Sequence, residues 1–283
     1  MVKLLADSTC DLSKELAEKY NIEIIPLNIL LGENEYQDGE NITPDEIYKW
    51  SDENKQTPKT SAVSFDRIME AFERNTADGS EVICFSISDS MSTTGNVMRM
   101  AAEELELTDR IYVVDSQNIT LGIGMLLIEA SKMVDEGKSA AEIVAEIEEL
   151  KPLARTSFIV DTLTYLHRGG RCSGVAALAG GVLKLHPKIV VENGKMRPDK
   201  KYRGKMPVAI EAYVKDLEED LKNANHERAF IVHSGCAPTT INMVNEYVKR
   251  LGLFREIIIL RAGSVISSHC GPGTLGVVFM ASK

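Results

Sequence analysis

The sequence predicts a two-domain α/β protein, with an N-terminal mainly parallel sheet covered by helices on both faces and a C-terminal mixed α/β domain. In the first half, short apolar strands alternate with amphipathic helices, which is the pattern of a parallel sheet joined by crossover helices. In the second half, Asn193-Gly194 between two apolar runs indicates a β-hairpin, whose antiparallel strands make the sheet mixed. The 283 residues are enough for two domains, which we expect at 1–152 and 153–283.

Apolar periodicity and helix caps define the elements of the first domain. Thr43 and Ser139 each stand three residues before a glutamate, which is a capping box that begins a helix. The expected strands are 2–6, 22–31 with an interruption at Pro26, 81–85 and 111–114. The expected helices are 13–20, one from Thr43 past Trp50, 65–74, 97–105, 119–134 and one from Ser139 that ends before Pro152.

Shorter signals define the second domain. The expected strands are 158–160, 189–191, one from Met196, 229–232, 256–260 and 276–280. The expected helices are a short one through Tyr165 and Leu166, a small-residue helix at 175–185, 208–221 and 239–251. Between the last two strands, 267–276 contains three glycines and a proline, so we expect a connecting loop that carries His269. This histidine could bind an anion, or it could only satisfy a carbonyl.

Composition and charge argue against several classes of function. The formal net charge of −10 and the pI of about 5.1 disfavour nucleic acid as a partner and allow at most transient contact with an anionic membrane. The five cysteines are widely spread without a C-x-x-C pair, and the histidines lack metal-site spacing, so we expect no metal. The sequence has neither a signal-peptide core nor a run long enough to span a bilayer, which indicates a cytoplasmic protein.

Small polar clusters follow several strands of the first domain. They are Asp7-Ser8-Thr9, the hydroxyl-rich run from Ser86 to Thr94, and Asp115-Ser116. In open parallel sheets, ligands bind outside the carboxyl ends of the strands, and a helix N-terminus there favours an anion. The clusters therefore indicate an anion-binding edge, although helix caps and turns also select these residue types.

Five side chains could form the polar end of a binding site. If Thr60, Ser61, Ser92, Thr94 and His269 converge, they make a ring of hydrogen-bond donors that suits a carboxylate or a phosphate. Thr60 and Ser61 are expected in a polar loop ahead of the helix at 65–74. The sequence has no G-x-S-x-G, P-loop or G-x-G-x-x-G motif, so we expect no catalytic residue and no cofactor.

A basic patch follows the hairpin in this acidic chain. It consists of Lys200, Lys201, Arg203 and Lys205. Lysine is common on solvated edge strands, and the patch could equally be a docking face for an acidic partner. Both interpretations stay open.

The order of these motifs resembles that of the DegV family along nearly the whole chain. The run around Ser92 is similar to the family's Leu-Ser-Gly-Thr loop, with Met91 and Thr93 in place of leucine and glycine, and Gly95 stands where the family has an aromatic residue. The other matching motifs are Asp7-Ser8-Thr9 with Asp11, Pro58-Lys59-Thr60-Ser61, Val114-Asp115-Ser116, the stretch from Asp161 and Tyr165 to Gly169-Gly170-Arg171, Asn193-Gly194, and Ser268-His269-Cys270-Gly271-Pro272-Gly273.

The resemblance implies a protein that binds one long-chain fatty acid between its two domains. Such a protein presents the carboxylate to a separate ATP-binding kinase subunit, which phosphorylates it, and then holds the acyl-phosphate. The resemblance implies that Thr60 and Ser92 bond the carboxylate, with Ser61 and Thr94 nearby and His269 facing the same headgroup. It also implies that Arg171 contacts the phosphorylated product or the kinase, and we assign Arg203 of the basic patch to the same contact.

Two other functions remain as alternatives. One is a stand-alone enzyme acting on a small phosphorylated or carboxylated metabolite, with His269 as acid or base and Asp7 or Asp115 as its partner. The uncharged helices expected after Ile119 and Val175 argue against it, because a polar metabolite needs no long apolar wall. The other is an interaction module that works through the basic patch.

Overall fold

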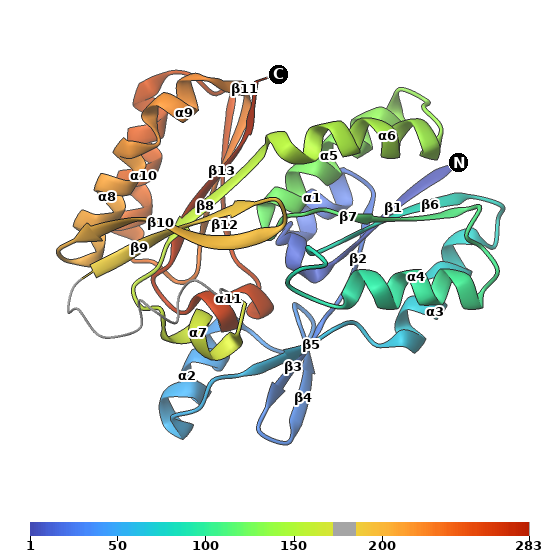
Figure 1. Cartoon of the computed structure of the whole chain (residues 1–283), viewed down its shortest axis with the longest axis horizontal. Helices are drawn as coiled ribbons and strands as arrows, with labels where there is room; N and C mark the ends of the chain where they lie inside the picture. The colour runs from blue at the N-terminus through green and yellow to red at the C-terminus, as the bar shows by residue number, and fades with distance from the viewer. Residues whose placement is uncertain (172–184, 283) are drawn as a thin grey trace.

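The computed structural model describes residues 1–171 and 185–282, and it contains two large sheets and one small one (Figure 1). The first large sheet has the order β2-β1-β6-β7 and the second β10-β9-β8-β13-β11-β12. The small sheet, β4-β3-β5, lies below them in the view of Figure 1. The predicted α/β class, with a parallel sheet followed by a mixed one, is confirmed.

The first sheet is parallel throughout and is covered on both faces, as predicted. Its strands are β1 (Val2–Asp7), β2 (Ile22–Ile25), β6 (Glu81–Ser86) and β7 (Ile111–Asp115). One face packs on α3 (Phe65–Thr76) and α4 (Thr94–Glu104), and the other on α5 (Leu121–Asp135) and α6 (Ala140–Leu150). Side chains of β1 alternate between the two cores, since Leu4 and Ala6 face α5 while Leu5 faces α3 and α4. The short α1 (Lys14–Lys19) begins at the N-cap Ser13.

The second sheet is mixed, since β11 and β12 pair in parallel and the other neighbours pair antiparallel. Its strands are β8 (Ala154–Ile159), β9 (Leu185–Glu192), β10 (Lys195–Arg203), β11 (Ala224–His233), β12 (Glu256–Arg261) and β13 (Leu275–Ala281). One face carries α8 (Met206–Asp216), α9 (Glu218–Lys222) and α10 (Pro238–Leu251). The single helix expected at 208–221 is thus two helices, α8 and α9, which meet at Leu217.

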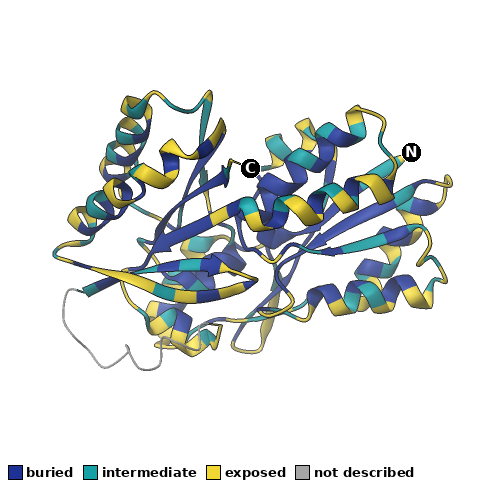
Figure 2. Ribbon diagram, turned by 45° about the horizontal axis from the view of Figure 1, so that its top comes forward, coloured by how far each residue is buried: buried dark blue, intermediate teal, exposed yellow. Residues whose placement is uncertain are grey.

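Helix α5 packs on both large sheets. It contacts β1 and β6 of the first sheet and β8 and β13 of the second, and one continuous core contains side chains from all of them. This placement explains why the helix is apolar on nearly every side. The central strands of both sheets are mostly buried, whereas the outer helices alternate buried and exposed residues (Figure 2). The edge strands β10 and β12 of the second sheet are more accessible. The second sheet begins at Ala154, and a domain boundary near Pro152 stays a prediction.

Two local predictions were wrong, and both concern the segments that carry the expected polar residues. Residues 59–61 were expected in a loop but form β5 (Lys59–Ser61), because Thr60 pairs with Ile29 of β3 (Asn28–Leu31). Residues 267–270 were also expected in a loop, but they belong to helix α11 (Ser264–Cys270). The Ser268 hydroxyl donates to the Ser264 carbonyl at 2.8 Å, so it bonds within the helix. The expected loop is confined to 271–274.

The remaining elements are the 3-10 turns η1 (Ser8–Cys10) and η2 (Lys151–Leu153), β4 (Asn34–Gln37), α2 (Pro44–Asn54) and α7 (Thr164–Gly169). Three of them, η1, α2 and α7, contact α11. The helix expected at 175–185 lies outside the described residues, except for Leu185, which begins β9. Within the described ranges, no helix combines the length and the apolar character needed to cross a bilayer.

Candidate functional site

A cavity of about 450 Å³ lies where α11 meets β5, the loop after β6 and the hairpin β9–β10. Most of its wall is apolar, contributed by Leu27, Ile87, Ile119, Leu166, Met196 and Ile266. Its polar lining includes four of the side chains that the sequence singled out, Thr60, Ser61, Ser92 and His269. The cavity is thus an apolar space with one group of hydroxyls and an imidazole, and its size is in the range of ligand pockets.

Thr60 and His269 form a hydrogen-bonded pair, although 209 residues separate them. The Thr60 Oγ1 and His269 Nε2 atoms are 2.8 Å apart. The other ring nitrogen, Nδ1, is buried without a partner, and a Cβ at Gly169 would overlap it. Since a buried unpaired N–H is rarer than a buried unpaired acceptor, the ring proton belongs on Nε2 and is donated to Thr60. The Thr60 hydroxyl hydrogen is then free to point at a ligand.

The imidazole of His269 is neutral at physiological pH. Burial of the ring, with the positive charge of nearby Arg171 as the second cause, lowers its pKa to about 4 from the ordinary value of 6.5. The polar group of the cavity therefore offers hydrogen bonds without a histidine charge. This suits a ligand that is held by donors and by its apolar part.

Ser92 is oriented by Thr94, which does not itself reach the cavity. The two hydroxyl oxygens are 2.9 Å apart, and the Thr94 backbone N–H donates to Ser92 Oγ at 3.2 Å. Thr94 is fully buried and begins α4. Thr93, which replaces the family's glycine, has a φ of −88°, so this loop needs no left-handed residue there. Gly95 is required for space, because a Cβ would overlap the Asp89 carboxylate.

The two arginines assigned to a phosphate or partner lie in different places. Arg171 is exposed and lines the cavity, and its guanidinium donates to the Met91 carbonyl at 3.3 Å and to the Gly169 carbonyl at 2.6 Å. Arg203 is exposed at the end of β10 and is not part of the cavity wall. The structure therefore brings Arg171, but not Arg203, to the side chains predicted to bind the headgroup.

Sequence reasoning missed how the hairpin closes one side of the cavity. The hydroxyls of Ser88 and Ser90 both donate to the carbonyl of Gly194 at the hairpin tip, at 2.7 and 2.5 Å. Met196, just beyond the tip, lines the cavity. The Asn193-Gly194 turn was visible in the sequence, but its contact with the serine-rich loop depends on how the two sheets pack.

It also missed a small apolar space beside the cavity. This space of about 20 Å³ shares Ile119, Ile266 and Cys270 with the main cavity and reaches β8 and β13 at Phe158 and Gly276. Its wall is almost entirely apolar. The wall of the cavity at Ile119, Ile266 and Cys270 therefore borders a further apolar space in the core.

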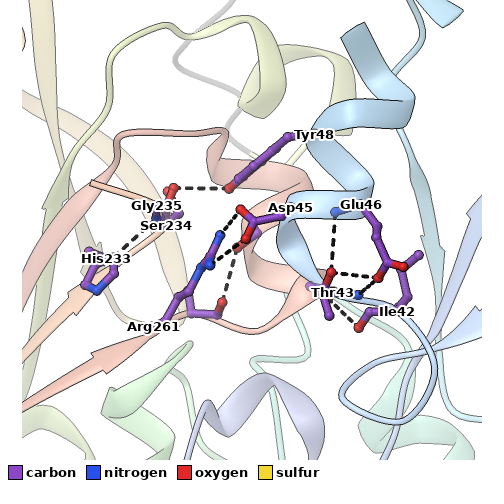
Figure 3. A network of polar contacts seen from close by, with 12 residues as sticks. Ile42, Thr43, Asp45, Glu46, Tyr48, His233, Ser234, Gly235 and Arg261 are labelled. Carbon is purple, nitrogen blue, oxygen red and sulfur yellow. Dashed lines mark hydrogen bonds and ion pairs between the residues drawn. The ribbon is translucent and has the colours of Figure 1, made fainter. Parts of the chain in front are cut away.

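Polar contacts join α2 to the second sheet behind α11 (Figure 3). Asp45 accepts two hydrogen bonds from Arg261 at the end of β12, one of them at 3.0 Å from Nη1. The Tyr48 hydroxyl donates to the Ser234 carbonyl at 3.3 Å. These contacts fix α2, which packs against α11, so they support the side of the cavity that carries His269.

The order of motifs and the fold match one family over the whole chain. The model of the family described as "Uncharacterised protein, DegV family" matches residues 1–282. The chain belongs to the DegV family. A DegV domain-containing protein of Clostridium perfringens is 33% identical to this DegV protein over 98% of this chain and 96% of its own length.

Solved structures of DegV proteins share the fold. A DegV family protein from Thermus thermophilus, whose structure is described as fatty acid binding, is 31% identical with a TM-score of 0.91, and the match covers 99% of each chain. A stearic acid-binding protein from Eubacterium ventriosum is 29% identical with a TM-score of 0.86, and the match covers 99% of this chain and 98% of that one. Among the described residues of this DegV protein, no group of three or more His, Cys, Asp or Glu side chains is arranged to hold a metal ion.

Proposed function

We propose that this DegV protein binds one long-chain fatty acid in the cavity between its two sheets and presents the carboxylate to a separate ATP-binding kinase subunit. In this proposal Thr60 and Ser92 donate to the carboxylate, with Ser61 beside them. His269 holds Thr60 in place, and Thr94 does the same for Ser92. Arg171 contacts the phosphorylated headgroup or the kinase.

The observation that carries the proposal is the Thr60–His269 pair in the wall of a mostly apolar cavity. Burying a carboxylate is costly unless it accepts hydrogen bonds, and the hydroxyls of Thr60 and Ser92 can supply them. Each buried methylene of the tail adds roughly 0.8 kcal/mol, so the apolar wall would provide most of the affinity. The small apolar space beside Cys270 lies where we place the end of the tail. The similar structures described as fatty acid-binding and stearic acid-binding support the ligand class.

The hydrogen bonds of the two candidate partner acids favour binding over stand-alone catalysis. Asp7 accepts from Thr9 and from the Ile87 backbone, and Asp115 accepts from the backbones of Asp89 and Gln117. Neither contacts His269, whose ring bonds Thr60. In the alternative mechanism, Asp7 or Asp115 would have to orient the imidazole. We therefore propose that a partner subunit supplies the chemistry.

Ligand extraction tests the binding step. We expect mass spectrometry of the purified chain to find a co-purified long-chain fatty acid, and the delipidated chain to bind added stearic acid in titration calorimetry. A protein that yields no lipid and binds none refutes the proposal.

Reconstitution tests the presentation step. The stearate-loaded chain, an ATP-binding fatty acid kinase subunit and ATP should form acyl-phosphate, trapped as a hydroxamate with hydroxylamine. We expect no product when either protein is omitted. Product formed by this chain and ATP alone would favour the enzyme instead. Arg171→Ala should lower the rate even when stearate saturates the chain, and Arg203→Ala tests the basic patch in the same assay.

A further inference from the structure

Three buried aspartates, Asp7, Asp11 and Asp38, bond to segments that form the cavity wall without lining the cavity, and the proposed function does not use them. Asp11 and Asp38 line a separate space of about 600 Å³. Asp7, Asp11 and Asp38 are 1%, 7% and 5% exposed. Their mutual repulsion contributes to a raised pKa for Asp7 and Asp11, behind burial as the largest cause. Buried carboxylates are costly unless well hydrogen-bonded, and they are weak evidence for stability. The presence of three buried carboxyl groups at or beyond the end of β1 therefore suggests a role in addition to holding the fold together.

Two of them hold the start of the helix that carries His269. Asp11 Oδ1 accepts the Gly263 backbone N–H at 2.9 Å, and Asp38 Oδ1 accepts that of Ser264 at 2.7 Å. Helix α11 has only seven residues, so its short length gives it little stability of its own. The direction of α11, and with it the place of His269, therefore depends on these two carboxylates.

The remaining oxygens bond to the other walls of the cavity. Asp7 Oδ2 accepts the Ile87 N–H at 2.7 Å, at the start of the loop that leads to Ser92. Asp11 Oδ2 accepts the Thr120 hydroxyl at 2.6 Å, beside the cavity residue Ile119.

The hydroxyl of Ser8 links Asp38 to Leu27, next to the strand that pairs with Thr60. Asp38 Oδ2 accepts the Ser8 hydroxyl at 2.9 Å, and the same Ser8 oxygen accepts the Leu27 N–H at 3.1 Å. Leu27 lines the cavity and immediately precedes β3, the strand that pairs with Thr60. Each protein segment that carries a predicted headgroup-binding side chain is thus linked to one of the three aspartates.

We propose that Asp7, Asp11 and Asp38 are positioning residues for the carboxylate of the bound fatty acid. They fix the Ser92 loop, the strand of Thr60 and the helix of His269 relative to one another, so the donors converge before the ligand arrives. This inference rests on the proposed function. Preorganised donors avoid the cost of ordering on binding, so loosening them should weaken the interaction with the carboxylate and leave the tail contacts in place.

Two ligands with the same tail separate positioning from general stability. Delipidated wild type and the variants Asp7→Asn, Asp11→Asn and Asp38→Asn are titrated with stearic acid and with octadecan-1-ol. Asparagine keeps the size of the side chain but replaces one acceptor oxygen with a donor. We expect stearic acid to bind about tenfold more weakly to each variant, while octadecan-1-ol stays within about twofold, because the loss of one well-placed bond corresponds to about a factor of ten.

A matched control loses a buried hydrogen bond elsewhere. Ser131 is buried on α5 and donates to the Tyr20 carbonyl at 3.0 Å, and it is not part of the cavity wall. Ser131→Ala should lower the melting temperature without changing the preference for acid over alcohol. If Asp38→Asn does not fold, Ser8→Ala breaks the same link to Leu27, and we expect the same loss of preference.

The result that overturns the inference is an unchanged preference for acid over alcohol in the folded aspartate variants. An equal weakening of both ligands overturns it too, since that outcome indicates a general loss of structure. If the wild type binds neither ligand, the proposed function itself is refuted and this inference falls with it.

Discussion

At the scale of single residues, Thr60 and His269 act as one hydrogen-bonding unit. Thr60 Oγ1 and His269 Nε2 are 2.8 Å apart, and with the ring proton on Nε2 the threonine hydroxyl hydrogen is free for a ligand. The lowered pKa of His269 keeps the imidazole neutral. Removing either side chain leaves the other without its partner. We therefore expect the effects of the two substitutions on fatty acid binding to be less than additive.

The variant Thr60→Ala with His269→Ala should bind stearic acid roughly 10- to 100-fold more weakly than wild type, which corresponds to one or two lost hydrogen bonds to a carboxylate. Titration calorimetry on the delipidated protein measures the affinity for stearic acid. Thr60→Ser keeps a hydroxyl at the same place and should lose much less. Undiminished affinity in the folded double variant would contradict the assignment of the headgroup.

His269 should stay neutral until the solution is distinctly acidic. Its pKa is lowered to about 4 by burial and by the charge of Arg171. The unfolded histidine has an ordinary pKa near 6.5, so the folded state binds fewer protons between these values. The stability that this group contributes is present above pH 6.5 and is lost as pH falls towards 4. NMR titration of the imidazole carbon signals measures the pKa directly. The variant His269→Asn identifies which of the signals belongs to this residue. A midpoint near 6.5 would contradict the described burial of the ring.

At the scale of elements, the contact between the hairpin tip and the serine-rich loop controls one wall of the cavity. Gly194 has a φ of +76°, and a Cβ there would lie 2.7 Å from Ser88 Oγ. Gly194→Ala should lower the free energy of unfolding by roughly 1–3 kcal/mol, through left-handed strain and the displaced serine bond. It should also speed the release of bound stearate, because Met196 follows the turn and lines the cavity. Stopped-flow displacement and chemical denaturation measure the two effects.

Gly79→Ala is the matched control for that substitution. Gly79 has a φ of +84°, with no atom within 4 Å of the position that a Cβ would take. This variant has the same kind of backbone strain without a clash, far from the cavity. Equal effects of the two substitutions on stability and on release would show that the hairpin contact has no special role.

Most strands and most helices could be predicted because their signals are local. Capping boxes at Thr43 and Ser139 and the apolar periods of β1, β6 and β7 lie within a few residues of sequence. The chemistry of the site could also be predicted in part, since Thr60, Ser61, Ser92 and His269 do line one cavity. Their role in binding a carboxylate stays a prediction.

What could not be predicted depends on contacts between distant segments. Strand β5 has three residues and exists because Thr60 pairs with Ile29, which no periodicity over so short a stretch can reveal. Helix α11 starts where Asp11 and Asp38 accept the first backbone N–H groups, 252 and 226 residues away in sequence. The glycines and hydroxyls of 267–276 are typical of a loop, and only these long-range bonds explain the helix.

At the scale of the whole molecule, the two sheets are held together by more than the shared helix α5. Arg228 on β11 bonds Glu256 at 2.7 Å and reaches the Tyr20 hydroxyl of the first half at 3.0 Å. Arg261 and Asp45 join the halves at α2 (Figure 3). With the apolar core around α5 common to both sheets, we expect the chain to unfold in one cooperative transition.

The three buried aspartates should make that transition depend on pH in an unusual direction. Burial raises the pKa of Asp7 to about 6 and of Asp11 to about 8, and it raises that of Asp38 as well. Between the unfolded value of 3.8 and these folded values, the folded state binds more protons than the unfolded one. The stability that protonation contributes is fully present below pH 3.8 and is lost as pH rises towards 8.

Chemical denaturation of delipidated protein at pH 6, 7, 8 and 9 tests this with Asp11→Asn as the partner variant. Asparagine does not titrate, so the difference in unfolding free energy between wild type and variant should fall with rising pH, by at most about 1.4 kcal/mol per pH unit for one proton. The fall should level off above pH 8, where Asp11 is ionised in both states. Curves that stay parallel from pH 6 to 9 would mean that Asp11 is ionised throughout. The carboxylate would then hold the start of α11 as a full charge over the whole physiological range.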